Sequence, residues 1–144
     1  MRVAGILSAK GATVATVPPL TPVAEAAGQL RLRGVGALVV SDDGRTVLGL
    51  LNERDLVRRV AERGAAALAE PVRAVMETSV LTCAPEDDIE TLARMMTEHR
   101  RRHLPVLVDG QLAGIVSIGD VVKARLEELE EERRHLHDYI TTGR

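Results

Sequence analysis

Apolar residues recur at helical spacing in two separate stretches of the chain. The two sets are Val23, Ala26, Ala27 and Leu30, and then Ile89, Leu92, Ala93 and Met96. Positions i, i+3, i+4 and i+7 fall on one side of a helix, so each stretch predicts an amphipathic helix with one buried stripe. Thr21 and Asp87 stand where the helices should begin, and both residue types favour the N-cap. Pro22 suits a first turn, and Asp87 with Glu90 resembles a capping box.

Each predicted helix is followed by two short apolar runs separated by a turn. The runs are Val35–Val40 and Val47–Leu51 in the first half, and Leu104–Val108 and Leu112–Val116 in the second. They are almost uncharged and rich in β-branched residues, which is typical of buried strands. The intervening Ser41–Gly44 and Asp109–Gly110 favour hairpin turns. A further helix is expected after each hairpin, from about Asn52 to Arg63 and from about Ser117 onward.

The chain therefore predicts an α+β fold made of one strand–helix–strand–strand–helix (βαββα) unit used twice. A unit of about 60 residues buries little surface alone, so we expect the two copies to share a core across a pseudo-two-fold axis. We expect the first repeat at 1–66, the second at 67–126 and a C-terminal helical extension and tail at 127–144, with Gly64–Pro71 joining the repeats.

The C-terminal extension carries a heptad-like apolar stripe. Its members are Val122, Leu126, Leu129, Leu136 and Ile140, with Arg133 in the remaining position. Two interpretations stay open. The helix either folds onto its own domain with a solvated outer face, or packs against a second copy in a homodimer.

Composition excludes several classes of protein. The 144 residues carry a net charge of −2, and Tyr139 is the only aromatic residue. Neither feature favours a nucleic-acid partner. Cys83 is the single cysteine, so we expect no disulfide framework and no thiolate zinc site. No apolar run reaches the roughly 20 residues of a membrane span. The N-terminus does not resemble a signal peptide, and we expect a cytoplasmic location without a membrane partner.

A second repeated feature lies at the start of each last helix. Gly49–Val57 and Gly114–Val122 both read as glycine, two aliphatics, a small polar residue, two variable positions, aspartate and two aliphatics. Ser117 and Asp120 are spaced as an N-cap and its acidic partner, which alone explains both residues. The same geometry also suits a nucleotide. The helix N-terminus and the serine hydroxyl can donate to phosphate, and the carboxylate can accept from two sugar hydroxyls.

The paired motifs, together with Arg102–Val106, resemble a pair of cystathionine-β-synthase-type (CBS) domains over about residues 3–126. The resemblance implies two repeats joined across their sheets, with two clefts that bind adenosine-containing ligands such as AMP, ADP or ATP. It also implies a regulatory role towards a separate, unknown protein, no catalytic residues, and pairing into disc-shaped dimers.

By the same resemblance, one cleft better matches the family pattern. It would use Asp120 for the ribose hydroxyls, Ser117 for phosphate and Ile115 beside the base. His103 matches a position that contacts phosphate in the regulatory γ subunit of AMP-activated protein kinase. The opposite wall would come from Lys10, Ala15, Val35 and Gly36. The second cleft would use Asp55, Asn52, Val80, Leu81 and Leu104. Asn52 replaces the usual serine or threonine there, which puts the phosphate contact in question.

Other candidates point to weaker hypotheses. Cys83 is expected to be a small buried residue, and His99 with His103 could hold a metal only if one helix carried both. The run Arg100–Arg102 is either a solvated helix end or a phosphate or partner contact. Two other functions compete with ligand sensing. One is a dimeric scaffold that binds nothing, and the other is a small nucleotide-acting enzyme, for which the sequence offers no phosphate-binding loop.

Overall fold

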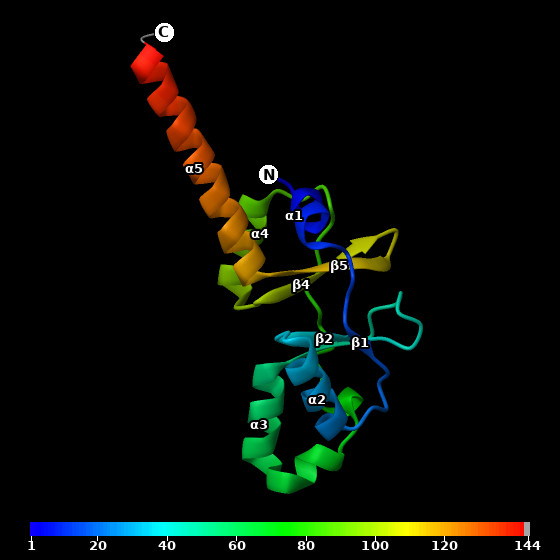
Figure 1. The fold of residues 1–144 in the computed structure, drawn as a ribbon. Coiled ribbons are helices and arrows are strands. Elements are labelled where there is room, and N and C mark those ends of the chain that lie inside the picture. Colours follow the sequence, from blue (N-terminus) through cyan, green and yellow to red (C-terminus); the bar gives the residue numbers. More distant parts are fainter. Residues whose placement is uncertain (143–144) are drawn as a thin grey trace.

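The structure is a computed structural model that describes residues 1–142. The end of the predicted tail, 143–144, lies outside the described residues. Two small sheets face each other across the middle of the molecule, and helices cover their outer sides (Figure 1). The predicted α+β fold of two repeats with a long C-terminal helix is confirmed.

The first repeat contains a three-stranded sheet and two helices. Its elements are β1 (Thr16–Val17), α2 (Val23–Arg33), β2 (Ala37–Val40), β3 (Gly49–Asn52) and α3 (Glu53–Arg63). Strand β2 lies in the middle of the sheet, parallel to β1 and antiparallel to β3. Two short 3₁₀ helices, η1 (Gly64–Ala69) and η2 (Val72–Ala74), then lead towards the second repeat.

The second repeat repeats this order with a shorter first strand. Its elements are α4 (Ile89–His99), β4 (His103–Val108), β5 (Gln111–Ser117) and α5 (Ile118–Thr142). Strands β4 and β5 form an antiparallel hairpin. The first strand is reduced to Cys83, which bridges to Val106 in parallel.

An N-terminal helix, α1 (Val3–Lys10), packs on the second repeat although it precedes the first one in sequence. Val3 and Ile6 are buried in the same cluster as Leu92 and Val116. The added helix therefore completes the core of the second repeat. The division of the chain at residue 66 stays a prediction.

Three apolar clusters hold the fold together. One lies inside each repeat, and the third lies between the two sheets. The third cluster contains buried Ala37, Val39 and Leu50 of the first repeat. Leu112 and Ile115 of the second repeat pack against it. This cluster joins the faces of the two sheets.

In two helices the N-cap lies one residue later than the sequence predicted. Helix α2 begins after Pro22, which makes no side-chain cap, so the Thr21 cap was wrong. The Thr21 carbonyl instead accepts from the Val72 amide at 2.8 Å. Helix α4 is capped by Asp88, which accepts from the Glu90 amide at 3.2 Å, so the capping box at Asp87 was also wrong. The Asp87 carboxylate accepts from Ala84 in the preceding turn.

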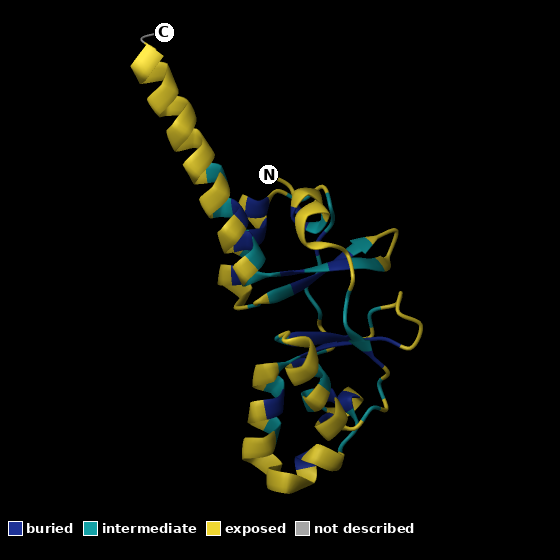
Figure 2. Ribbon diagram, in the orientation of Figure 1, coloured by how far each residue is buried: buried dark blue, intermediate teal, exposed yellow. Residues whose placement is uncertain are grey.

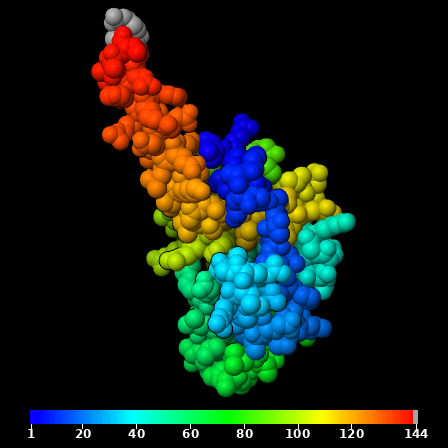
Figure 3. Space-filling view, viewed as in Figure 1, coloured from blue at the N-terminus to red at the C-terminus, as the bar shows by residue number. Residues whose placement is uncertain are grey.

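Helix α5 extends well beyond the rest of the molecule (Figures 1 and 3). Only Val121 and Ala124 of this helix are buried, and every residue from Leu129 to Thr142 is exposed (Figure 2). Its first turns are fastened by the N-terminal amino group, which lies 2.7 Å from Glu128 Oε2. Among the described residues, no helix is long and apolar enough to cross a membrane.

Candidate functional site

The entrance of α5 forms a complete capping box. The Ser117 amide donates to Asp120 Oδ2 at 2.9 Å, and the Asp120 amide donates to Ser117 Oγ at 3.2 Å. The sequence folds this way because β5 ends at Ser117 and the next residue already belongs to the helix. Asp120 is thus held one turn inside the helix N-terminus, with a hydroxyl beside it.

Lys10 closes this entrance from the other end of the chain. Its Nζ donates to Asp120 Oδ2 at 2.7 Å and to the Ile115 carbonyl at 3.1 Å. Burial acts to raise the pKa of Asp120, but the hydrogen bonds from Lys10 and Ser117 outweigh it and lower that pKa below its usual value. The carboxylate therefore stays ionised and paired with the lysine at neutral pH.

The entrance of α3 repeats the arrangement with an amide in place of the hydroxyl. The Asp55 amide donates to Asn52 Oδ1 at 2.9 Å, and the Asn52 amide donates to Asp55 Oδ2 at 3.1 Å. Asn52 is therefore a good substitute for serine as a cap. The remaining oxygen, Asp55 Oδ1, lies 4.0 Å from a guanidinium nitrogen of Arg58. No lysine equivalent to Lys10 contacts Asp55 among the residues that the structure describes.

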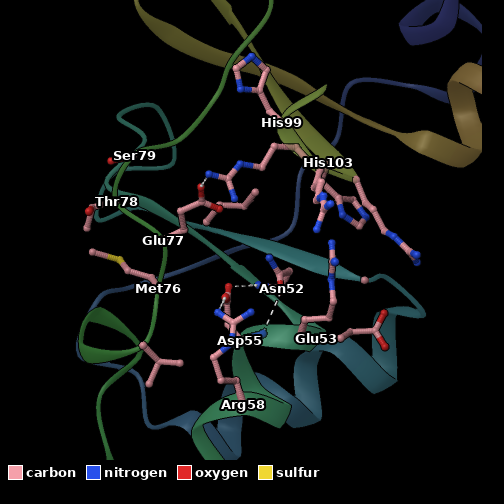
Figure 4. Close-up of a pocket in the computed structure, with 17 residues that line it drawn as sticks. Asn52, Glu53, Asp55, Arg58, Met76, Glu77, Thr78, Ser79, His99 and His103 are labelled. Carbon is pink, nitrogen blue, oxygen red and sulfur yellow. Dashed lines mark hydrogen bonds and ion pairs between the residues drawn. The ribbon is translucent and has the colours of Figure 1, made fainter. Parts of the chain in front are cut away.

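A cavity of about 860 Å³ opens at this second entrance and is lined by both repeats (Figure 4). The first repeat contributes Gly36, Leu50 and the segment from Asn52 to Asp55, with Arg58. The second half contributes a connecting segment, 75–79, and the stretch from His99 to His103. The wall therefore joins the N-terminal end of α3 to the loop between α4 and β4.

Positive charge dominates this cavity. Five arginines line it, namely Arg54, Arg58, Arg100, Arg101 and Arg102. The acidic residues on the wall are Glu53, Asp55 and Glu77. Two of the arginines are paired, Arg58 with Asp55 and Arg101 with Glu77. No ion pair of Arg54, Arg100 or Arg102 is recorded within residues 1–142, so the cavity keeps an excess of positive charge that suits an anionic group.

The pair of Glu77 and Arg101 joins the connecting segment to the loop after α4. A guanidinium nitrogen of Arg101 lies 2.5 Å from Glu77 Oε1. Burial raises the pKa of Glu77, and the charge of Arg101 opposes that shift. The backbone of Glu77 also exchanges two hydrogen bonds with Leu50, at 2.9 and 3.0 Å. The connecting segment is therefore fixed to both repeats and forms a rigid side of the cavity.

His103 lies between the two helix entrances. It opens β4 directly opposite Ser117 in the hairpin and also lines the cavity at Asp55. Burial lowers its pKa, and the nearby charges of Glu53 and Asp120 only partly oppose this effect. The imidazole packs so closely on Gly36 that a Cβ there would lie 3.1 Å from Cε1. His103 is therefore neutral at physiological pH and fixed between the repeats.

The structure brings some of the predicted site residues together and separates others. Lys10, Ile115, Ser117 and Asp120 contact one another directly. Gly36 and His103, which the resemblance assigned to the Asp120 cleft, line the cavity at Asp55 beside Asn52, and the charges of Lys10 and Asp120 also act on His103. Of the remaining residues, Ala15 packs on the first core and Val80 packs between the sheets. Leu81 and Leu104 pack in the second core, and Val35 is exposed. Because the Leu104 side chain is fully buried there, it cannot line a cleft.

Several cavity residues were not predicted from the sequence. They are Leu50, Glu53, Arg54, Arg58 and the segment 75–79. Segment 76–79 has no periodicity and lies before the regular elements of the second repeat, so its position is known only from the hydrogen bonds between Glu77 and Leu50 of β3. The two histidines of the metal hypothesis do not share one helix, since His99 ends α4 and His103 begins β4.

Comparison with known proteins gives a consistent result. A family model described as "CBS domain" matches residues 12–62 and 72–127. The CBS domain-containing protein CBSX3, mitochondrial, of Arabidopsis thaliana is 36% identical over 125 residues, which are 84% of this chain and 61% of that protein. The chain thus spans less than two thirds of that relative's own length.

Two solved structures are similar over most of the chain. The CBS-domain containing protein ATU1752 from Agrobacterium tumefaciens superposes with a TM-score of 0.84 and 46% identity, covering 87% of this chain and 99% of that one. The CBS domain protein PAE2072 from Pyrobaculum aerophilum, solved as a complex with AMP, gives a TM-score of 0.74 and 27% identity. That likeness covers 83% of this chain and 89% of the Pyrobaculum chain.

Proposed function

The chain belongs to the CBS domain family, and from this premise we propose that it is a regulatory module that binds an adenosine-containing nucleotide between its two repeats. The nucleotide is AMP, ADP or ATP, and the bound state is communicated to a separate protein. The observation that carries the proposal is the cavity at Asp55, where a carboxylate and an excess of arginine meet on walls from both halves.

The chemistry of this cavity matches the two polar parts of a nucleotide. Asp55 uses Oδ2 in its cap, which leaves Oδ1 to accept from ribose hydroxyls. The guanidinium groups of Arg54, Arg100 and Arg102 can donate to phosphate oxygens. The volume of about 860 Å³ lies in the usual range for small-molecule sites. The AMP complex of the Pyrobaculum relative supports the same ligand class for this chain.

We assign the principal site to the Asp55 cleft and a weaker one to the Asp120 cleft. At Asp120 the carboxylate oxygen that closes the cap also accepts from Lys10. A sugar hydroxyl that approaches Oδ2 of Asp120 must therefore compete with the lysine, whereas Oδ1 has no recorded hydrogen bond within residues 1–142. Within residues 1–142 Asp55 has no lysine contact, and its recorded ion pair is the longer one with Arg58, at 4.0 Å, beside the cavity of about 860 Å³.

A bound nucleotide can change the arrangement of the two repeats because each repeat contributes one wall of the cavity. Arg54 stands on α3 of the first repeat, while Arg100 and Arg102 belong to the second repeat. Without an anion between them, these like charges repel across the cleft. A bound phosphate favours the arrangement that brings them together, and it shifts the equilibrium by its difference in affinity for the two arrangements.

A thermal-unfolding panel tests the proposal. The full chain is heated alone and with AMP, ADP, ATP, S-adenosylmethionine and adenosine, with guanosine monophosphate as the control for the base. A ligand at about a hundred times its Kd should add about 2.7 kcal/mol of apparent stability. We expect at least one adenine nucleotide to raise the Tm, and more than its guanine counterpart does. If none of the adenosine compounds raises the Tm, the proposal is wrong and the fold serves as a scaffold.

A further inference from the structure

One arginine of the cavity at Asp55 is already held by an acid of the chain itself. A guanidinium nitrogen of Arg101 lies 2.5 Å from Oε1 of Glu77 (Figure 4). Among the lining arginines, Arg58 makes the other recorded ion pair within residues 1–142, and that pair with Asp55 is 4.0 Å long. Arg101 is therefore the arginine for which a ligand anion meets the closest internal competitor.

Glu77 lies beside the space that a ligand at Asp55 would occupy. Glu77 and Arg101 both line the cavity, and their side chains are 15% and 39% exposed. Burial raises the pKa of Glu77, the charge of Arg101 opposes that shift, and the charge of Asp55 adds to it. The two carboxylates are thus close enough to repel each other. A sugar bound at Asp55 would bring its phosphate near Glu77 as well.

The ion pair leaves part of Arg101 unused. Nε of Arg101 is buried and makes no recorded hydrogen bond within residues 1–142. A guanidinium binds an oxyanion best through two parallel N–H donors. A phosphate monoester also carries up to about two negative charges at pH 7, more than a carboxylate does. A phosphate in the cavity can therefore compete with Glu77 for Arg101.

The two members of the pair are fixed to different repeats. The backbone of Glu77 exchanges two hydrogen bonds with Leu50, which lies in β3 of the first repeat. Arg101 lies between α4 and β4 of the second repeat, and its amide donates to the Met96 carbonyl at 2.9 Å. The ion pair therefore ties the sheet of the first repeat to the second repeat. A ligand that takes Arg101 from Glu77 releases this tie.

We propose that Glu77 is an internal competitor for the phosphate of the ligand, and that a bound nucleotide exchanges the Glu77–Arg101 ion pair for a contact between its phosphate and Arg101. This assignment rests on the proposed nucleotide site and adds to it a residue that determines specificity. Adenosine has no group that requires Arg101. Glu77 therefore sets the preference between adenosine and AMP, and only a ligand with a phosphate releases the tie between the repeats.

Calorimetric titration of the full chain with AMP and with adenosine tests the role of Glu77. Glu77→Gln keeps the shape of the side chain and removes its charge. We expect this variant to bind AMP about fivefold more tightly than wild type, because a partly exposed ion pair no longer has to be broken. Adenosine should bind both proteins equally.

Glu70→Gln is the matched control. The Glu70 side chain is also 15% exposed and lies 2.6 Å from Arg59, but neither residue lines the cavity. Glu70→Gln should therefore bind both ligands as wild type does. A gain in AMP affinity equal to that of Glu77→Gln would contradict a specific role of Glu77.

A double-mutant cycle separates competition for Arg101 from simple repulsion of the phosphate. The effect of Glu77→Gln is measured in wild type and in Arg101→Gln. If Glu77 occupies Arg101, most of the gain in AMP affinity is lost when the arginine is absent. An equal gain in both backgrounds would show that Glu77 acts only through its charge, and the proposal would be wrong.

Arg101→Gln alone gives a second measurement that does not depend on the folding of Glu77→Gln. It should weaken AMP about tenfold and leave adenosine unchanged. Unchanged AMP affinity in both single variants would overturn the exchange while the nucleotide site remained. If AMP, ADP and ATP bind to none of these proteins, the nucleotide site itself is wrong, and the role of Glu77 fails with it. Circular dichroism of each variant checks that the compared proteins are folded.

Discussion

Lys10 and Asp120 lie in direct contact although they stand near opposite ends of the sequence, with Nζ 2.7 Å from Oδ2. Lys10 is the last residue of α1, and Asp120 lies in the first turn of α5. The ion pair therefore fastens the N-terminal helix to the entrance of the C-terminal one. A sugar hydroxyl that approaches this oxygen must compete with the lysine.

Replacing this lysine should change the titration of Asp120. In Lys10→Met we expect the pKa of Asp120 to rise, because the lysine opposes the effect of burial. Since the folded pKa lies below 3.8, the contribution of the pair is present at neutral pH and lost as the pH falls through the folded pKa. Wild type should exceed Lys10→Met by about 0.5–1 kcal/mol in free energy of unfolding at pH 7, and by less in acid.

Urea denaturation at pH 7 and in acid, with NMR titration of the carboxyl, measures both effects. Lys123→Met is the matched control. Lys123 is exposed on α5, the helix that carries Asp120, and has no recorded ion pair within residues 1–142. A stability difference that is the same at both pH values would contradict the assigned role of Lys10.

Gly49 allows strand β3 to approach the connecting segment closely. A Cβ at this position would lie 2.9 Å from the Glu77 carbonyl oxygen and would overlap the Met76 side chain. Because a backbone atom cannot yield easily, Gly49→Ala should lower the free energy of unfolding by about 1–3 kcal/mol.

Gly28→Ala is the control for the change at Gly49. Gly28 lies inside α2 with nothing within 4 Å of an added Cβ, so alanine should stabilise that helix by up to about 1 kcal/mol. Chemical denaturation of both variants gives the comparison. Equal effects at the two positions would show that the close approach at Gly49 is relaxed in solution.

Cys83 should be unreactive in the folded protein. Burial raises the pKa of its thiol to about 12, and the side chain is enclosed by the second core. Little thiolate is therefore present at pH 8, and a thiol reagent should label the native chain far more slowly than the chain in urea. Labelling of wild type at the rate of an exposed thiol, such as the one in Glu131→Cys on α5, would contradict this burial.

The repeat and most of its elements could be predicted from the sequence because they depend on local periodicity. The apolar stripes through Val23 and Ile89 correctly predicted helices α2 and α4. The two apolar runs on either side of each turn correctly predicted the antiparallel pairs β2–β3 and β4–β5. The helix starts were less accurate. Asp87 and Asp88 are both good caps, and only the hydrogen bonds of the preceding turn distinguish them.

The site was less predictable because its geometry depends on contacts that are distant in sequence. The two capping boxes could be inferred from residue type, and the approach of Lys10 to Asp120 is consistent with the family resemblance. Arg101 is held by its ion pair with Glu77. The position of Glu77 in turn depends on the backbone hydrogen bonds that Glu77 makes with Leu50 of β3. No pattern in the sequence marks that chain of contacts, so the part of the wall of the Asp55 cavity that Glu77 and Arg101 form was not predicted.

Calorimetric titration of the full chain with AMP, ADP and ATP tests the central claim most directly. Asp55→Ala should weaken binding of the best ligand by about 1.5–3 kcal/mol, roughly ten- to a hundredfold, because hydrogen bonds to a charged acceptor are lost. Asp88→Ala, which removes a comparable helix cap far from the cavity, should bind as wild type does. Unchanged binding in Asp55→Ala, or an equal loss in Asp88→Ala, would contradict a nucleotide site at Asp55.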